Sequence, residues 1–147
     1  MEATRMQARS ARAGENGFTL VELLVVLAIL GLLVALAAPR VMKYLGSART
    51  DTARIQIEKL SGVLDLYRLE VGHYPTEQEG LRALVEKPAQ SDSWNGPYLK
   101  SAESLVDPWG APYGYRSPGQ HGEFDLYTLG ADGKEGGDGA DRDVVNW

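Results

Sequence analysis

The chain has 147 residues, of which 44% are apolar and 24% charged, and its formal net charge is -5. This charge argues against a general nucleic-acid binder, because such proteins present a basic surface to the phosphates. The absence of cysteine excludes disulfide scaffolds, thiolate zinc sites, iron–sulfur clusters and cysteine nucleophiles. No serine-hydrolase, zinc-protease or P-loop motif occurs, and His73 and His121 lie in different predicted segments. We therefore expect no enzyme.

The N-terminal region joins two segments of different chemistry. Residues 1–17 are polar and contain three arginines, whereas residues 18–38 are apolar except for Thr19, Glu22 and Gly31. A helix over residues 18–38 would reach roughly 31 Å, about the thickness of the hydrocarbon core of a membrane. Arginines before a span favour a cytoplasmic N-terminus, so the rest of the chain is predicted on the opposite side.

Three interpretations of this segment compete. A secretory signal peptide would be cleaved at Ala35-Leu36-Ala37, which has the small residues that cleavage requires. The second is a plain membrane anchor. Neither explains Glu22, because a carboxylate inside a bilayer costs about 3 kcal/mol even on a lenient scale. The span also exceeds the apolar region of about 7–15 residues that signal peptides carry. The third interpretation gives Glu22 a partner and a function.

The run Gly17-Phe18-Thr19-Leu20-Val21-Glu22 before an apolar helix resembles the processing motif of type IV pilins and pseudopilins. The resemblance implies that a prepilin peptidase cuts after Gly17 and N-methylates Phe18, and that Glu22 serves assembly. The cut would create a cationic amine four residues before Glu22. That carboxylate could neutralise the amine of a neighbouring subunit or of its own chain, since opposite charges attract strongly in a low dielectric.

The segment after the span is predicted to remain helical. Pro39 removes one helical hydrogen bond and predicts a kink. Beyond it, apolar or small residues recur at alternating spacings of four and three: Val41, Leu45, Ala48, Thr52 and Ile55, then Ile57, Leu60, Leu64, Tyr67 and Val71. This pattern predicts an amphipathic helix with one buried face, the stripe shifting by half a turn between Ile55 and Ile57. Gly72 is predicted to end the helix.

The C-terminal half predicts short elements. Thr76 and Glu79 fit a capping box, so a short helix is expected from Glu77 to Glu86, followed by a loop over 88–111 in which tryptophan rings hold the chain in place. Residues 112–117 and 123–129 alternate in polarity, which predicts a β-hairpin with a five-residue loop. A third short strand is expected near Val144.

The tail is rich in acidic residues and glycine. Residues 130–143 contain five acids, two bases and five glycines. Calcium takes six to eight oxygen ligands, including backbone carbonyls, and glycine-rich acidic turns can supply them. A solvated acidic tail fits the composition equally well, so the residues alone leave both interpretations open.

Further motifs resemble the major pseudopilin family of type II secretion. They are Tyr74-Pro75-Thr76, Trp94–Leu99, Asp107–Gly110, Leu129-Gly130-Ala131-Asp132-Gly133 and the final Asn146-Trp147. The resemblance implies a structural calcium ion in a loop over residues 129–143. The candidate ligands that it implies are Leu129, Asp132, Lys134, Asp138, Asp141 and Asp143, of which Asp132 matches most directly.

The resemblance implies an α+β, type IV pilin-like fold, with a long N-terminal helix packed on a small domain that has a short helix and a small antiparallel sheet. It divides the chain into a cleaved leader (1–17), a transmembrane and filament-core helix (18–38) and a periplasmic domain (39–147). The implied function is that of the major subunit of a helical filament that drives export of folded proteins from the periplasm across the outer membrane.

The implied partners are further copies of the chain, minor pseudopilins, the prepilin peptidase and the inner-membrane assembly platform, with no nucleic acid. The chain would cross the inner membrane once, with a cytoplasmic N-terminus and a periplasmic domain. The alternatives are a type IV pilin, a minor pseudopilin, or a secreted or anchored calcium-binding module.

Overall fold

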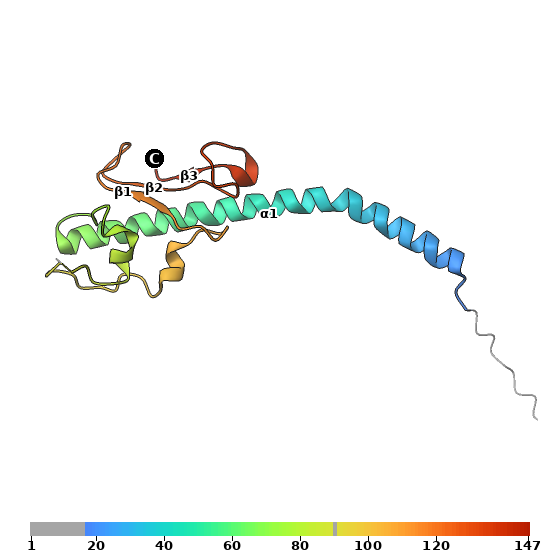
Figure 1. The fold of residues 1–147 in the computed structure, drawn as a ribbon, viewed down its shortest axis with the longest axis horizontal. Coiled ribbons are helices and arrows are strands. Elements are labelled where there is room, and N and C mark those ends of the chain that lie inside the picture. The colour runs from blue at the N-terminus through green and yellow to red at the C-terminus, as the bar shows by residue number, and fades with distance from the viewer. Residues whose placement is uncertain (1–16, 90) are drawn as a thin grey trace, which may run out of the picture. The chain divides into compact units, whose positions relative to one another are not determined.

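The computed structural model describes residues 17–89 and 91–147 (Figure 1). Its elements are α1 (Leu20–Val71), the 3-10 helices η1 (Gly80–Leu84), η2 (Ala102–Leu105) and η3 (Gly139–Asp141), and the strands β1 (Gly114–Arg116), β2 (Asp125–Thr128) and β3 (Val144–Val145). The chain divides between Ala38 and Pro39 into two compact units. Most of the predicted leader, residues 1–16, lies outside the described residues.

The described part of the first unit is an exposed apolar helix. All residues from Leu20 to Ala38 are exposed, and α1 is long and apolar enough to cross a membrane. The helix passes through Pro39 without ending, because a proline removes only one helical hydrogen bond. The kink at Pro39 remains a prediction.

The core of the second unit forms along one face of α1. The buried residues of this face are spaced alternately by four and three: Gly46, Thr50, Ala53, Ile57, Leu60, Leu64 and Tyr67. Leu84, Leu126 and Val144 from the other elements belong to the same core. This 4–3 spacing keeps the contact residues on one side of a helix.

The predicted half-turn shift of the buried stripe is wrong. Val41, Leu45, Ala48, Thr52 and Ile55 are all exposed. The stripe that contains Ile57 and Leu60 instead continues toward the N-terminus through Ala53, Thr50 and Gly46. Ala53 and Thr50 are the same residue types as Ala48 and Thr52 of the exposed stripe, so residue type did not show which stripe is buried. The small size of the buried residues allows other segments to approach the helix closely.

The structure confirms the predicted end of α1 and corrects the next helix. Gly72, with φ 97°, follows the last helical residue, and its N–H donates to the Arg68 carbonyl at 2.8 Å. The Thr76–Glu79 capping box forms: the Thr76 N–H donates to Glu79 Oε2 at 2.8 Å, and the Glu79 N–H to Thr76 Oγ1 at 3.3 Å. The α-helix predicted over Glu77–Glu86 is instead the short 3-10 helix η1. Gly80 adopts φ 57°, a left-handed conformation that interrupts a right-handed helix.

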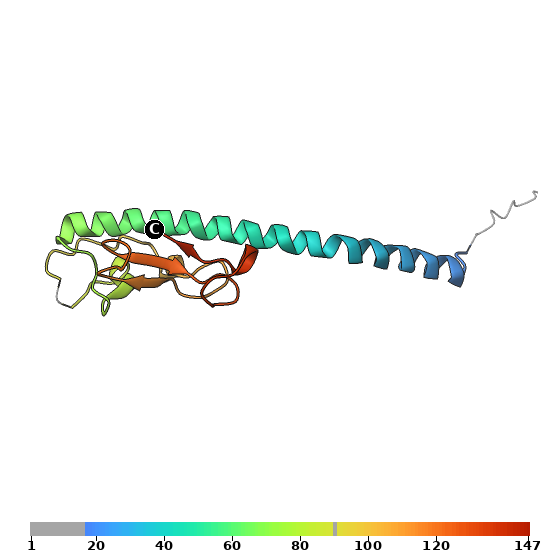
Figure 2. The same ribbon diagram turned by 90° about the horizontal axis from the view of Figure 1, so that it is seen from above.

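The sheet is small and antiparallel, as predicted, in the order β1-β2-β3. Tyr115 pairs with Leu126 and Thr128 with Val144. Figure 2 shows the strands and loops of this unit together on one side of α1. The hairpin strands are shorter than predicted and their connection is longer. The Asp125 side chain accepts hydrogen bonds from the backbone of Gln120 and His121, which orders the connection as a loop.

The long loop after η1 leads into the 3-10 helix η2. The half-buried Trp94 donates from Nε1 to the Ala83 carbonyl at 2.8 Å and packs edge-on against Tyr98. This contact confirms the prediction that a tryptophan ring holds the irregular chain in place.

Candidate functional site

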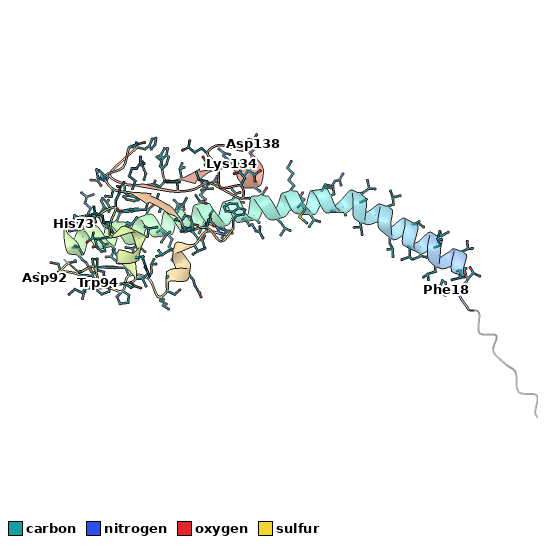
Figure 3. The ribbon with its side chains drawn as sticks, viewed as in Figure 1. Phe18, His73, Asp92, Trp94, Lys134 and Asp138 are labelled. Carbon is teal, nitrogen blue, oxygen red and sulfur yellow. The ribbon has the colours of Figure 1, made fainter. Side chains whose placement is uncertain are left out.

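The processing segment lies at the start of α1. Phe18, labelled in Figure 3, is 83% exposed and directly follows Gly17. The Glu22 carboxylate contacts Thr19: Oε2 accepts from the Thr19 backbone N–H and hydroxyl, both at 2.9 Å. The Glu22 N–H donates to Thr19 Oγ1 at 3.2 Å, which completes a capping box.

The sequence analysis did not predict this capping box, although a threonine followed three residues later by a glutamate is its standard signal. It satisfies two backbone N–H groups at a helix end that is exposed within the described part of the chain. It also holds the Glu22 carboxylate at Thr19, the residue that follows Phe18, whose nitrogen would become an amine on cleavage. The exposed Glu22 remains accessible to a second molecule.

The C-terminal loop, residues 129–143, is folded by glycines in the left-handed region. These are Gly130, Gly133, Gly136, Gly137 and Gly139, with φ between 64° and 93°. Two of them also lie against the Asp141 carbonyl. A Cβ at Gly130 would lie 2.8 Å from that oxygen, and one at Gly137 would lie 2.5 Å from it. Only glycine fits at either position, so the loop has a defined fold and is not a random acidic tail.

The loop carboxylates fall into two groups. Asp132 Oδ1 accepts from the Lys134 N–H at 3.1 Å, and Asp143 Oδ2 accepts from the Gly136 N–H at 2.9 Å. Asp138 and Asp141 are exposed and flank or end η3. Figure 3 shows Asp138 and Lys134 in this loop, at the other end of the unit from His73, Asp92 and Trp94.

One carboxylate oxygen of the loop has no partner. Asp143 Oδ1 is buried and makes no hydrogen bond within the described part of the chain. A buried, unsatisfied acceptor costs about 1–3 kcal/mol, and a cation would remove that cost. Asp143 also lines a cavity of about 310 Å³ together with Leu129 and Glu135. These features fit a cation at this end of the loop.

Side chains alone do not complete such a site. Across residues 17–89 and 91–147, no three histidine, cysteine, aspartate or glutamate side chains gather in a metal-binding arrangement. The structure therefore does not bring Asp132, Asp138, Asp141 and Asp143 together as one cluster. A bound ion would need backbone carbonyls for much of its shell, which calcium accepts.

The loop is attached to α1 at two residues that sequence reasoning missed. Gly46 is buried against Ala140, and Thr50 Oγ1 donates to the Gly139 carbonyl at 3.2 Å. The hydroxyl is also within 3.1 Å of the Gly46 carbonyl. The available signal was a pair of small residues four positions apart on an amphipathic helix.

The hairpin loop closes the opposite side of the cavity. The rings of His121 and Trp147 stack at 4.1 Å, and His121 Nδ1 lies 3.3 Å from Asp125 Oδ2. Desolvation by burial raises the pKa of Asp125. The hydrogen bonds from the Gln120 and His121 backbone and the His121 ring outweigh it, so the pKa lies below its usual value.

Comparison with known proteins identifies the family. The family model described as type II secretion system (T2SS), protein G, matches residues 40–147, and the model of the prokaryotic N-terminal methylation motif matches residues 12–38. The chain belongs to the type II secretion system protein G family. The second match includes Gly17, Phe18 and Glu22, the residues of the processing segment.

Curated relatives and a solved structure agree with this assignment. The type II secretion system core protein G of Pseudomonas aeruginosa is 49% identical over 140 residues, covering 92% of this chain and 97% of the relative. That of Vibrio cholerae is 43% identical over 136 residues, covering 90% and 92%. The crystal structure of the major pseudopilin of enterohaemorrhagic Escherichia coli matches with a TM-score of 0.59 and 32% identity, covering 72% of this chain and 92% of that one. These matches favour the major pseudopilin over the alternative functions.

Proposed function

We propose that this protein G family member is the major structural subunit of a type II secretion pseudopilus, a helical filament that drives export of folded proteins across the outer membrane. The observation that carries the proposal is the wholly exposed apolar helix from Leu20 to Ala38, combined with the family match. Such a surface is stable only in a membrane or against other apolar helices. On assembly, the helix leaves the membrane and packs against the apolar helices of neighbouring subunits.

Maturation precedes assembly in this proposal. A prepilin peptidase cuts after Gly17 and methylates Phe18, as the methylation motif suggests. Before assembly the chain crosses the inner membrane once, with its N-terminus cytoplasmic and residues 39–147 periplasmic. Minor pseudopilins and the inner-membrane assembly platform are the further partners. The removed segment contains the three arginines that favour a cytoplasmic N-terminus.

Glu22 provides the charge that matches the new amine. In the precursor its carboxylate is occupied by Thr19. After cleavage, the amine of Phe18 competes for that carboxylate, either within the chain or from a neighbour. An ion pair between apolar helices fixes their axial register, because an unpaired charge there is costly.

Substitution of Glu22 tests this function. Glu22→Ala is expected to insert into the membrane and be cleaved as the unmodified chain, yet to form at least tenfold fewer filaments in cells that carry the secretion system. Thr19→Ala removes the cap but keeps the carboxylate, and is the matched control. Normal filaments from Glu22→Ala would contradict the assembly role.

We infer that the C-terminal loop binds a structural calcium ion. The unpartnered Asp143 Oδ1 and the glycine-shaped backbone support this inference. Asp132 and Asp143 would supply carboxylates, and Leu129 and Lys134 backbone carbonyls. Asp138 and Asp141 remain candidates for further oxygens. The ion would offset the entropy of ordering a loop that buries little apolar surface.

Calcium titration of the full chain in detergent tests the site. Heat on addition of calcium, absent with magnesium at the same concentration, is the expected result. Asp143→Asn should abolish it, whereas Asp92→Asn, an exposed aspartate elsewhere in the unit, should not. Equal binding by both variants would contradict the assignment of Asp143.

A further inference from the structure

Residues 39–45 lie between the apolar span and the folded part of the second unit, and we call them the linking segment. The segment is helical and exposed throughout, and Gly46 is the first buried residue of α1. Its seven residues rise roughly 10 Å along the helix axis. The polar headgroup layer on one side of a bilayer is about 5–8 Å deep. A helix that crosses a membrane through residues 18–38 would therefore have its linking segment among the lipid headgroups.

The linking segment presents two cations and an aromatic ring together. Arg40, Lys43 and Tyr44 occupy positions i, i+3 and i+4, which are neighbours on the surface of a helix. All three side chains are exposed, and Tyr44 is 78% exposed. Arg40 and Lys43 follow the last residue of the span by two and five positions, roughly 3 and 8 Å along the axis. Both charges thus lie within the depth of a headgroup layer.

The chain itself does not neutralise these two cations. No acidic residue occurs between Glu22 and Asp51, so no carboxylate lies three or four positions from Arg40 or Lys43, where a helical ion pair would form. Across residues 17–89 and 91–147 neither side chain takes part in a salt bridge, whereas Arg54 pairs with Asp51. The two positive charges are therefore available to a partner outside the chain.

The position of these cations relative to the span is unusual. Basic residues near a membrane span concentrate on its cytoplasmic side. In the proposed topology Arg40 and Lys43 lie on the opposite side. The three arginines of the leader outnumber them in the precursor, but the proposed cleavage removes that leader. Arg40 and Lys43 then become the basic side chains nearest to the span. A contact that needs positive charge at this end of the span accounts for their placement.

We propose that Arg40 and Lys43 bind the anionic headgroups of phospholipids, such as phosphatidylglycerol, at the outer face of the inner membrane. The inference rests on the proposed topology and adds a lipid partner to it. A guanidinium group donates two parallel hydrogen bonds to a phosphate, and an ammonium group attracts it as a point charge. The ring of Tyr44 is apolar with a polar hydroxyl end, which suits the membrane–water interface. A subunit that enters the filament would have to release these lipids.

Energy transfer in vesicles tests the lipid preference. Because the chain has no cysteine, Ser47→Cys provides one exposed site for a donor dye, a helical turn beyond Lys43. The labelled full chain is inserted into phosphatidylcholine vesicles that contain a trace of acceptor-labelled phosphatidylglycerol or, in parallel, acceptor-labelled phosphatidylcholine. One basic residue near an anionic membrane surface strengthens binding about fivefold, so phosphatidylglycerol should be enriched around the helix by at least that factor. High salt should remove the enrichment.

Paired substitutions assign the preference to these two side chains. Arg40→Gln combined with Lys43→Gln should make energy transfer to the two lipids equal. Arg54→Gln combined with Lys59→Gln removes the same charge from exposed positions farther along α1 and should keep the enrichment. The Arg40 and Lys43 double variant should also melt at the same temperature as the unmodified chain, because both side chains are exposed and form no salt bridge within the described residues.

Two results would overturn the inference. Equal transfer to both lipids from the labelled chain would leave the cations to solvent or to an acidic protein. Loss of the enrichment in the Arg54 and Lys59 variant would show that total charge, and not the linking segment, attracts the lipid. The proposed function fails in a different way. If alkaline carbonate extracts the labelled chain from the vesicles, the transmembrane state is contradicted, and with it the inference that rests on that state.

Discussion

Ala140 of the C-terminal loop rests on Gly46 of α1 so closely that a Cβ at Gly46 would lie 2.8 Å from the Cβ of Ala140. Thr50, one helical turn further on, adds a hydrogen bond to the Gly139 carbonyl at 3.2 Å. The glycine-rich loop is therefore packed on α1. Changes in the order of the loop are expected to affect the stability of the whole second unit.

A larger residue at position 46 should loosen this contact. Gly46→Val forces its side chain into Ala140 and is expected to lower the free energy of unfolding by about 1–3 kcal/mol, as overpacking does. Thermal unfolding of the full chain in detergent measures the effect. Gly62→Ala, on the open face, is the control and should stabilise the helix by about 0.5–1 kcal/mol. An unchanged melting temperature for Gly46→Val would show that the loop does not rest on the helix.

Calcium removal should destabilise the second unit. At a free calcium concentration of a hundred times Kd, binding to the folded state alone stabilises by about 2.7 kcal/mol. Chelation is therefore expected to lower the melting temperature and to increase hydrogen exchange in residues 129–143. Asp132→Ala should melt at the same temperature with calcium and with chelator. If the melting temperature of the unmodified chain does not change when chelator is added, the calcium proposal is contradicted.

Protonation of Asp125 at low pH should loosen the hairpin loop. Because hydrogen bonds lower the pKa of Asp125 in the folded state, its contribution to the free energy of unfolding is complete above the ordinary pKa of about 4. The contribution is lost as the pH falls through the lower, folded-state pKa. The melting-temperature difference between the unmodified chain and Asp125→Asn should thus shrink as the pH falls below the ordinary pKa of about 4. A difference that stays constant over this range would contradict the role of the ionised carboxylate.

The ion pair between Arg68 and Glu123 should contribute little. Its side chains are 45% and 62% exposed, and the Tyr74 hydroxyl shares both partners. Solvent and salt screen exposed ion pairs, so Glu123→Gln should change the free energy of unfolding little, and any change should disappear in high salt. Denaturant unfolding at low and high salt measures this. A large loss of stability that persists in high salt would contradict this and mean that the network acts as a buried one.

Much of the fold was predictable because its signals are local. Gly72 ends α1, Thr76 and Glu79 form their capping box, and Val144 begins a third strand, each set by neighbouring residues. The spacing of apolar residues also predicted the helix correctly. It did not show which stripe the domain buries, because a 4–3 pattern is the same whether its partner lies in the same chain or in another.

The sequence predicted which residues belong to the candidate sites, but not which contacts those residues make. The sequence motif indicated Gly17, Phe18 and Glu22, yet it did not reveal that Glu22 first caps its own helix through Thr19. The resemblance implied calcium in the acidic loop, but no local pattern showed that Asp143 has an oxygen without a partner. The packing of Ala140 on Gly46 joins residues about ninety positions apart. Such long-range contacts carry no signal in a local pattern.

The most direct test of the account is the intact mass of the protein extracted from its native membrane. We predict a chain that begins at Phe18 and carries one extra methyl group, since the model of the N-terminal methylation motif matches residues 12–38 and the proposed maturation cuts after Gly17. A chain that begins at Ala38 would indicate an ordinary exported protein. An uncut chain, recovered with the peptidase present, would indicate a simple anchor, and either result would contradict assembly through a free N-terminus at Phe18.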